Sequence, residues 1–213
     1  MGLLKQNLFH IYFMNQKILI FLFIMVNFRL YGDQPKNQNL PQSELIASMK
    51  EGGLILYFRH ASTEKDYADQ IKADPNDGST QRVLSEKGWH EAVHIGNSFK
   101  YHSIPVGKVY SSQYFRAWQT AWLAFGKYEK NKDFNFLPFE DYTDEQVEKM
   151  KKTITPYLST LPPEGKNTII VAHDDPFEAS TGIYPEPQGV CYVVKPLGGN
   201  EFEILGSITP EQW

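Results

Sequence analysis

Polar side chains that could do chemistry follow short apolar runs at three places in this sequence of 213 residues. Each run is rich in β-branched or aromatic residues and is short enough to be a strand buried on both faces. Such strands occur mostly in parallel sheets, where ligands bind just beyond the carboxyl ends of the strands. The groups expected at this edge are Arg59 and His60, Ser111 and Ser112 leading to Arg116, and His173 with Asp174.

Two guanidinium groups and two imidazoles at one edge indicate a pocket for a tetrahedral dianion. The planar guanidinium fork of Arg59 or Arg116 can bond two oxygens at once and keeps its charge. A neutral imidazole is a good nucleophile near neutral pH when a hydrogen bond holds its other nitrogen. The cluster therefore predicts a phosphate pocket with a histidine nucleophile.

The elements that must position these groups alternate between strands and helices, which is typical of an α/β sandwich. The predicted strands span 54–58, 108–112, 168–172, 190–194 and 201–205, with a turn at 198–200 between the last two. The predicted helices span 43–50, 84–99, 114–128 and 143–158, with Ser43, Ser85 and Thr143 as N-caps. We expect a three-layer sandwich with a mostly parallel central sheet flanked by helices.

The N-terminal region differs from the rest of the chain. Residues 18–26 are an uninterrupted apolar run preceded by Lys17, too short for a bilayer, which takes roughly 20 residues. A charged flank before a short apolar run is typical of a secretory signal peptide. We expect 1–32 to be a signal peptide or N-terminal anchor (with Met14 as an alternative start), 33–41 a linker and 42–213 the catalytic domain. The expected location is periplasmic or secreted.

Composition and charge exclude several classes of protein. The chain is 41% hydrophobic and 14% aromatic, which is typical of a globular domain. A net charge of -4 with a pI of about 5.9 gives no reason to expect nucleic acid as a partner, and we expect membrane contact only through the N-terminal segment. The single cysteine, Cys191, excludes an intrachain disulfide and a cysteine-built zinc site.

Four motifs between about 53 and 196 resemble, in order, those of the histidine phosphatase (phosphoglycerate mutase-like) superfamily. They are Arg59-His60-Ala61, 81–88 (QRVLSEKG), 111–116 (SSQYFR) with Thr120-Ala121, and Ala172-His173. The resemblance implies hydrolysis of a phosphomonoester through a phosphohistidine on His60, without a metal or other cofactor. It also implies that Arg59 and Arg116 bind the phosphoryl oxygens and that His173 donates a further hydrogen bond.

The resemblance leaves the leaving-group acid open between two carboxyl groups. In one branch of the family it is a Glu some two dozen residues after the second Arg, which here is Glu140, 140 − 116 = 24 residues on. In the other branch an acidic residue directly follows the second His, which here is Asp174. We prefer Asp174, because its link to the site through His173 is short, and we also expect Thr63 to bind substrate.

We expect the substrate to be small and phosphorylated: a sugar phosphate, an envelope glycan phosphate or a phosphoprotein. Specificity is expected in residues 64–81, a long loop over the site, and in 129–146.

A competing motif is His90-Glu91-Ala-Val-His94, a literal H-E-x-x-H of the kind that binds zinc in metallopeptidases. Helical spacing places Trp89, Ala92, Val93, Gly96 and Phe99 on one apolar face and both histidines on the opposite face, toward solvent. The extended motif needs Gly at 97 and His at 100, where the chain has Asn and Lys. A zinc hydrolase and a non-catalytic phosphate-binding protein are the two alternatives to a phosphatase.

Overall fold

The computed structural model describes residues 35–64, 69, 73–137 and 142–213, so the expected signal segment and Glu140 lie outside the described residues. The strands are β1 (Ile55–Arg59), β2 (Val106–Ser111), β3 (Glu129–Lys130), β4 (Asn167–Ala172), β5 (Cys191–Gly198) and β6 (Glu201–Ile208). The helices are α2 (Gln42–Glu51), α3 (Glu86–Tyr101), α4 (Phe115–Phe125), α5 (Asp144–Ser159) and α6 (Asp174–Thr181). Short 3-10 turns span Gly78–Thr80, Lys132–Phe134 and Pro210–Gln212.

The strands form one sheet in the order β3-β2-β4-β1-β5-β6. Strand β4 lies between β1 and β2 and is parallel to both, and β3 is parallel to β2. The last two strands are antiparallel and form a hairpin on β1, as the turn at 198–200 predicts. The predicted α/β sandwich with a mostly parallel sheet is therefore confirmed.

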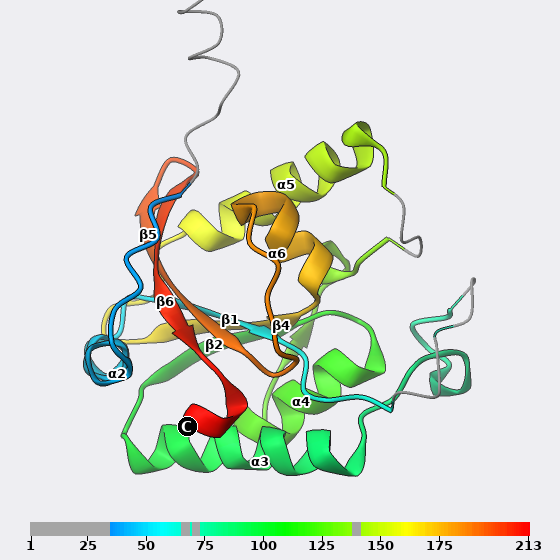
Figure 1. Cartoon of the computed structure of the whole chain (residues 1–213), viewed down its shortest axis with the longest axis horizontal. Helices are drawn as coiled ribbons and strands as arrows, with labels where there is room; N and C mark the ends of the chain where they lie inside the picture. Colours follow the sequence, from blue (N-terminus) through cyan, green and yellow to red (C-terminus); the bar gives the residue numbers. More distant parts are fainter. Residues whose placement is uncertain (1–34, 65–68, 70–72, 138–141) are drawn as a thin grey trace, which may run out of the picture. The chain divides into compact units, whose positions relative to one another are not determined.

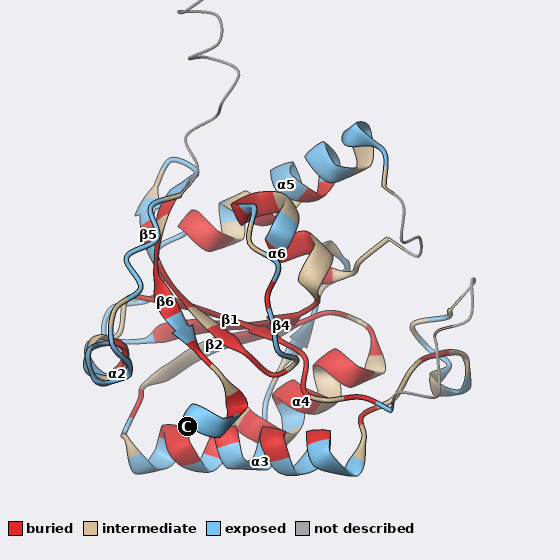
Figure 2. Cartoon of the chain, in the orientation of Figure 1, coloured by how far each residue is buried: buried red, intermediate tan, exposed pale blue. Residues whose placement is uncertain are grey.

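Helices cover both faces of the sheet, with α3 and α4 on one side and α5 and α6 on the other (Figure 1). Alternate residues of β1 supply the two cores, because successive side chains of a strand point to opposite faces. Leu56 and Phe58 pack in the cluster that contains α3 and α4 residues, whereas Ile55 and Tyr57 pack with α5 and α6. Both faces of the central strands are buried (Figure 2), as their apolar runs predict.

Two of the three predicted N-caps are confirmed. Ser85 accepts a hydrogen bond from the backbone of Gly88, and Thr143 forms a capping box with Gln146. The predicted N-cap Ser43 is wrong, because Ser43 lies inside α2. The helix begins at Gln42, after Pro41, and has no side-chain cap. Helix α6 and strand β3 are not predicted, since elements of eight and two residues are too short to show a clear hydrophobic period.

Part of the segment expected to be a linker is hydrogen-bonded to the domain. The backbone N–H groups of Gln38 and Leu40 donate to Ile204 and Leu205 of β6, at 2.9 and 2.7 Å. Residues 38–40 of the expected linker therefore pair with β6 in the described structure, while the boundary at residue 42 stays a prediction. Within the described residues, no helix has the length and apolarity needed to cross a membrane.

Helix α3 buries Ala92, Gly96 and Phe99 of the predicted apolar face, but leaves Trp89 and Val93 of that face exposed. Trp89 and Val93 are 49% and 43% exposed, while Glu91 is only 8% exposed. The helix turns Glu91 inward because its carboxylate accepts hydrogen bonds from Ser62, in the segment that follows β1. The buried surface of α3 is thus shifted toward Glu91 and away from Trp89 and Val93.

Two glycines allow α3 to lie this close to its neighbours. A Cβ on Gly88 would stand 1.9 Å from the carbonyl oxygen of Ser62, and one on Gly96 would stand 2.2 Å from that of Ala124. Both obstacles are backbone atoms, which cannot move aside as a flexible side chain could. The glycines therefore fix the distance from α3 to the segment after β1 and to α4.

We expect Gly96→Ala to lower the free energy of unfolding by about 1–3 kcal/mol, because the added methyl group overpacks the α3–α4 contact. Urea denaturation followed by circular dichroism measures the change. Asn97→Ala, at an exposed position of the same helix, is the matched control and should leave stability nearly unchanged. Equal stability of the two variants would show that the helices are not in close contact at Gly96.

Candidate active site

The carboxyl ends of β1, β4 and β2 bring the predicted residues to one edge of the sheet. Arg59 pairs with Ala172 in the parallel register, and the backbone N–H of His60 donates to the carbonyl of Ala172 at 3.0 Å. On the other side of β4, the N–H of Ser112 donates to Val171 at 3.0 Å. The residue after β4, His173, therefore emerges between the residues that follow β1 and β2.

The ring of His60 is held between an acceptor and a donor. Its Nδ1 lies 2.9 Å from the carbonyl oxygen of Ala61, and the Nε–H of Arg116 donates to its Nε2 at 3.1 Å. A carbonyl only accepts and a guanidinium only donates. The proton is therefore on Nδ1, and Nε2 carries the lone pair, as a nucleophile requires.

The ring of His173 lies 5.5 Å from that of His60, centroid to centroid. Its Nε2 contacts Ser112 Oγ at 2.8 Å, and that hydroxyl donates to Asn135 Oδ1 at 2.9 Å. Because the backbone N–H of Gln113 also donates to Asn135 Oδ1, the Ser112 proton is committed to Asn135. His173 must therefore donate through Nε2–H, which leaves its Nδ1 as the unprotonated nitrogen.

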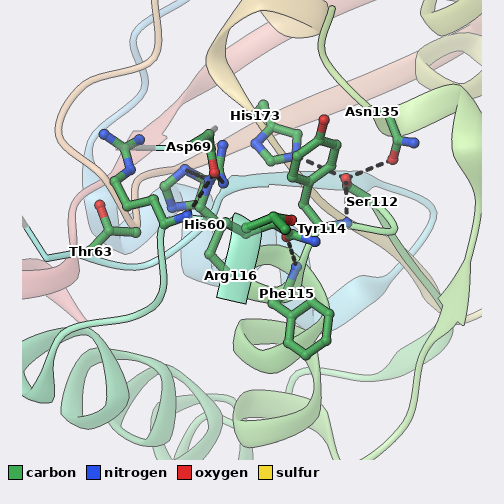
Figure 3. A network of polar contacts seen from close by, with 12 residues as sticks. His60, Thr63, Asp69, Ser112, Tyr114, Phe115, Arg116, Asn135 and His173 are labelled. Carbon is green, nitrogen blue, oxygen red and sulfur yellow. Dashed lines mark hydrogen bonds and ion pairs between the residues drawn. The ribbon is translucent and has the colours of Figure 1, made fainter. Parts of the chain in front are cut away.

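Figure 3 shows this arrangement, with the Ser112–Asn135 pair on the side of His173 away from His60. The Nδ1 of His173 is buried and has no hydrogen-bond partner among the described residues. The His60 ring thus donates from Nδ1 to Ala61, and the His173 ring donates from Nε2 to Ser112.

Arg59 lies in a polar cluster with the residue that follows His173. Its Nη2 forms an ion pair of 2.6 Å with Asp174 Oδ2, and its Nη1 donates to the carbonyl of Pro185 at 3.0 Å. Tyr184 connects the pair, because its hydroxyl accepts from Arg59 Nη2 at 3.3 Å and donates to Asp174 Oδ2 at 2.8 Å. Asp174 therefore holds the Arg59 guanidinium in place.

Two residues that the sequence analysis gave no role lie in the site. Asp69 Oδ1 accepts from Arg116 Nη1 at 2.9 Å and from the backbone N–H of Arg82 at 2.7 Å. The Arg82 side chain is near enough for its charge to act on both histidines, and its Nε is buried without a partner among the described residues, as is Nε of Arg59. Arg82 lies in the 81–88 motif and Asp69 in the loop expected over the site. The sequence therefore indicated both regions, but not the role of either residue.

Burial and positive charge keep both imidazoles neutral. Burial is the largest cause that lowers the pKa of His60 and of His173 well below the usual 6.5, and the charge of Arg116 is the next. Asp175 shows the opposite shift, since burial and the neighbouring Asp174 raise its carboxyl pKa to about 6. At neutral pH the site therefore holds two uncharged rings beside buried guanidinium groups.

Thr63 is near the site, but its polar groups are already engaged. It is 6% exposed, and its backbone N–H donates to Gln188 Oε1 at 3.0 Å. Its hydroxyl exchanges weaker contacts of 3.3–3.4 Å with the same amide. Substrate binding by Thr63 stays a prediction, as does the acid role of Glu140, which lies outside the described residues.

The H-E-x-x-H residues do not converge on one point. His90 is 81% exposed and lies 4.0 Å from Glu86, whereas the ring of His94 contacts the carbonyl of Trp213 at 3.0 Å. Glu91, which would activate water in a zinc site, is bound to Ser62 instead. Among the residues that the structure describes, no group of three His, Cys, Asp or Glu could hold a metal ion.

Solved structures share this fold. A candidate α-ribazole-5′-phosphate phosphatase from Escherichia coli K-12 matches with a TM-score of 0.55 at 13% identity, over 75% of this chain and 98% of the other. The protein histidine phosphatase SixA, complexed with tungstate, matches with a TM-score of 0.53 at 13% identity, over 74% and 97%. A phosphoserine phosphatase mutant from Entamoeba histolytica, complexed with phosphoserine, matches with a TM-score of 0.51 at 11% identity, over 75% and 98%.

No protein-family profile and no curated protein matches the sequence. The structural neighbours are members of the histidine phosphatase superfamily, and the fold implied by the motifs is thereby confirmed. At these identities the likeness establishes the fold alone.

We expect stability to fall as the pH is lowered below about 6.5, the unfolded pKa of His. Unfolded histidines then bind protons that buried His60 and His173 do not, each contributing up to about 1.4 kcal/mol per pH unit. Below about pH 6 the raised pKa of Asp175 acts in the opposite direction, because there the folded state binds the extra proton.

Urea denaturation at several pH values between 7.5 and 5.5 measures this slope. His173→Asn should reduce the slope of the free energy of unfolding against pH by about the contribution of one histidine. His90→Asn, at an exposed position, should not change it. An unchanged slope in His173→Asn would contradict a buried neutral ring.

Proposed function

We propose that this protein is a phosphomonoester hydrolase that acts through a phosphohistidine on His60. The observation that carries the proposal is the state of the His60 ring, whose Nδ1–H is bound to Ala61 while its Nε2 lone pair faces Arg116. A neutral imidazole with a fixed Nδ1–H is prepared to attack phosphorus through Nε2. The neighbouring guanidinium is then in place to bind the group transferred.

The proposed reaction has two steps. In the first, the Nε2 lone pair forms a bond to phosphorus while the ester P–O bond breaks, and a general acid protonates the leaving oxygen. In the second, the deprotonated acid takes a proton from a water that attacks the phosphohistidine, the N–P bond breaks, and inorganic phosphate leaves with Nε2 and the acid restored. Both steps spread negative charge over the phosphoryl oxygens, where preorganised donors lower the barrier.

Three arginines and His173 supply those donors. Arg116 is adjacent to Nε2, and the charges of Arg59 and Arg82 also act on both rings. His173 can donate from Nδ1 only after taking up a proton, because its Nε2–H is committed to Ser112. A bound phosphate dianion favours that protonation, so the ring would turn from neutral to cationic as the substrate binds.

The general acid stays a choice between two predicted carboxyl groups. Asp174 is in place beside the site, but its Oδ2 already accepts from Arg59 and Tyr184. To act as the acid, Asp174 would have to take up a proton after Arg59 moves from the carboxylate to the phosphoryl oxygens. We propose that sequence for Asp174, with Glu140 as the alternative acid.

The structural neighbours support the phosphatase class and a phosphorylated ligand. SixA is described as a protein histidine phosphatase, and the amoebal protein was solved with phosphoserine. The substrates proposed for this chain remain a sugar phosphate, an envelope glycan phosphate or a phosphoprotein. We also propose export through the N-terminal segment.

We expect wild-type protein to hydrolyse p-nitrophenyl phosphate equally well with and without a chelator, and His60→Ala to have no activity above background. Rapid quenching with radiolabelled substrate should trap an acid-labile, alkali-stable phosphoprotein in the wild type alone. His90→Ala, which changes an exposed histidine, is the matched control and should retain activity. Chelator-sensitive activity that survives His60→Ala would favour the zinc alternative, and phosphate binding without turnover would favour a non-catalytic binder.

Asp69 occupies a donor of Arg116 that a phosphoryl oxygen would use. We therefore expect Asp69→Asn to bind tungstate and inorganic phosphate more tightly, because the neutral amide competes less well for the guanidinium. A charged hydrogen bond is worth roughly 1 kcal/mol more than a neutral one, so the inhibition constant should fall about five-fold. Inhibition assays measure it, with Asp77→Asn, an exposed carboxylate, as control. An unchanged inhibition constant would show that Asp69 does not compete with the anion.

A further inference from the structure

Glu91 is a buried acid to which the proposed chemistry gives no role. It lies on α3 with 8% exposure, and the Lys87 ammonium 3.2 Å away is itself 69% exposed. An ion pair with so exposed a lysine contributes little. The carboxylate is instead held by Ser62, whose backbone N–H donates to Oε2 and whose hydroxyl donates to Oε1, both at 2.9 Å.

The Ser62 N–H belongs to the same peptide group as the carbonyl of Ala61. That carbonyl oxygen accepts the Nδ1–H of His60 at 2.9 Å. One planar peptide therefore connects the Glu91 carboxylate on its N–H side with the imidazole on its C=O side. A hydrogen bond from an amide N–H to an anion increases the negative charge on the amide oxygen, because successive hydrogen bonds polarise one another.

The peptides on either side of this one are held in place without Glu91. The backbone N–H of Ala61 donates to Thr120 Oγ1 at 3.1 Å, and the carbonyl of Ser62 accepts from the backbone and the hydroxyl of Ser85 at 3.0 and 3.1 Å. The carbonyl of His60 accepts from Gly189 at 2.8 Å. These neutral contacts hold the backbone on both sides of the Ala61–Ser62 peptide. The contribution specific to Glu91 is therefore its negative charge.

We propose that Glu91 is a positioning residue that acts on His60 through the Ala61–Ser62 peptide. A more negative Ala61 oxygen binds the Nδ1–H more firmly and leaves more electron density on Nε2, which is the attacking atom. The arrangement resembles a carboxylate–histidine pair with a peptide inserted between the two groups. This inference rests on the proposed phosphohistidine chemistry for its effect on rate, but not for its effect on the ring.

The test compares Glu91→Gln with Glu86→Gln, the same change at a position of α3 that is 93% exposed. In Glu91→Gln the side-chain amide oxygen can still accept from the Ser62 N–H, and the NH2 group can donate to the Ser62 hydroxyl oxygen, so shape and the number of hydrogen bonds are kept while the charge is lost. For Glu91→Gln we expect kcat to fall about 5–10-fold with little change in KM, the size of one charge-assisted hydrogen bond replaced by a neutral one. Glu86→Gln should match the wild type.

Nuclear magnetic resonance of ¹⁵N-labelled histidine supplies a readout that does not depend on activity. The wild type should show the His60 proton on Nδ1, and Glu91→Gln should move that proton resonance upfield as the hydrogen bond weakens. A purely structural role would lower the melting temperature without changing the resonance in the folded protein.

The results separate this inference from the proposed function. If the wild type lacks phosphatase activity, the proposed function fails, while the shift of the Nδ1 proton still decides the role of Glu91. Identical kcat and resonance in Glu91→Gln and Glu86→Gln would overturn the inference. A wild-type His60 that carries its proton on Nε2 would overturn it without any variant, even if Glu91→Gln failed to fold.

Discussion

The His60 ring lies between a group that can only accept a hydrogen bond and a group that can only donate one, and the rest of the site depends on this constraint. With Ala61 O on Nδ1 and Arg116 Nε on Nε2, only the neutral Nδ1–H form satisfies both contacts. In a protonated ring, the Nε2–H of His60 would face the Nε–H of Arg116, so that two donors would meet without an acceptor. Strand β1 brings the imidazole to this place and the first turn of α4 brings the guanidinium, so neither element alone determines the state of the ring.

Buried guanidinium groups require compensating charge, because an unpaired cation in the interior costs several kcal/mol. Asp174 meets this need for Arg59, and Asp69 meets it for Arg116. The Arg116 guanidinium also lies 5.2 Å from the centre of the Tyr114 ring, where the π face favours a cation. Because the compensating groups of Arg116 include one carboxylate from a loop, the phosphate of the proposed reaction would replace an internal anion at this guanidinium.

Local patterns in the sequence predicted most of the fold. Short β-rich runs located β1, β2 and β4, and Ser85 and Thr143 located the starts of two helices, because each signal depends on residues a few positions apart. What the local patterns did not show depended on contacts far along the chain. The segment before α2 is held by β6, and α6 is stabilised by packing such as that of Phe177 against Tyr57, neither of which any local period reveals.

In the site, too, local patterns predicted some residues, while the role of others depends on distant contacts. Glu91 is an example of the second kind. Arg59, His60 and His173 follow strand ends, so the sequence placed them once the strands were recognised. In the zinc alternative, the H-E-x-x-H spacing gives Glu91 the activation of a metal-bound water, whereas in the fold its carboxylate contacts the Ala61–Ser62 peptide, whose carbonyl binds the His60 ring. A four-residue spacing states which side chains share a face of a helix, but not what lies opposite that face. Here Gly88 allows the close approach to Ser62, so Glu91 contacts a peptide that is hydrogen-bonded to the His60 ring, 31 residues earlier in the sequence (91 − 60).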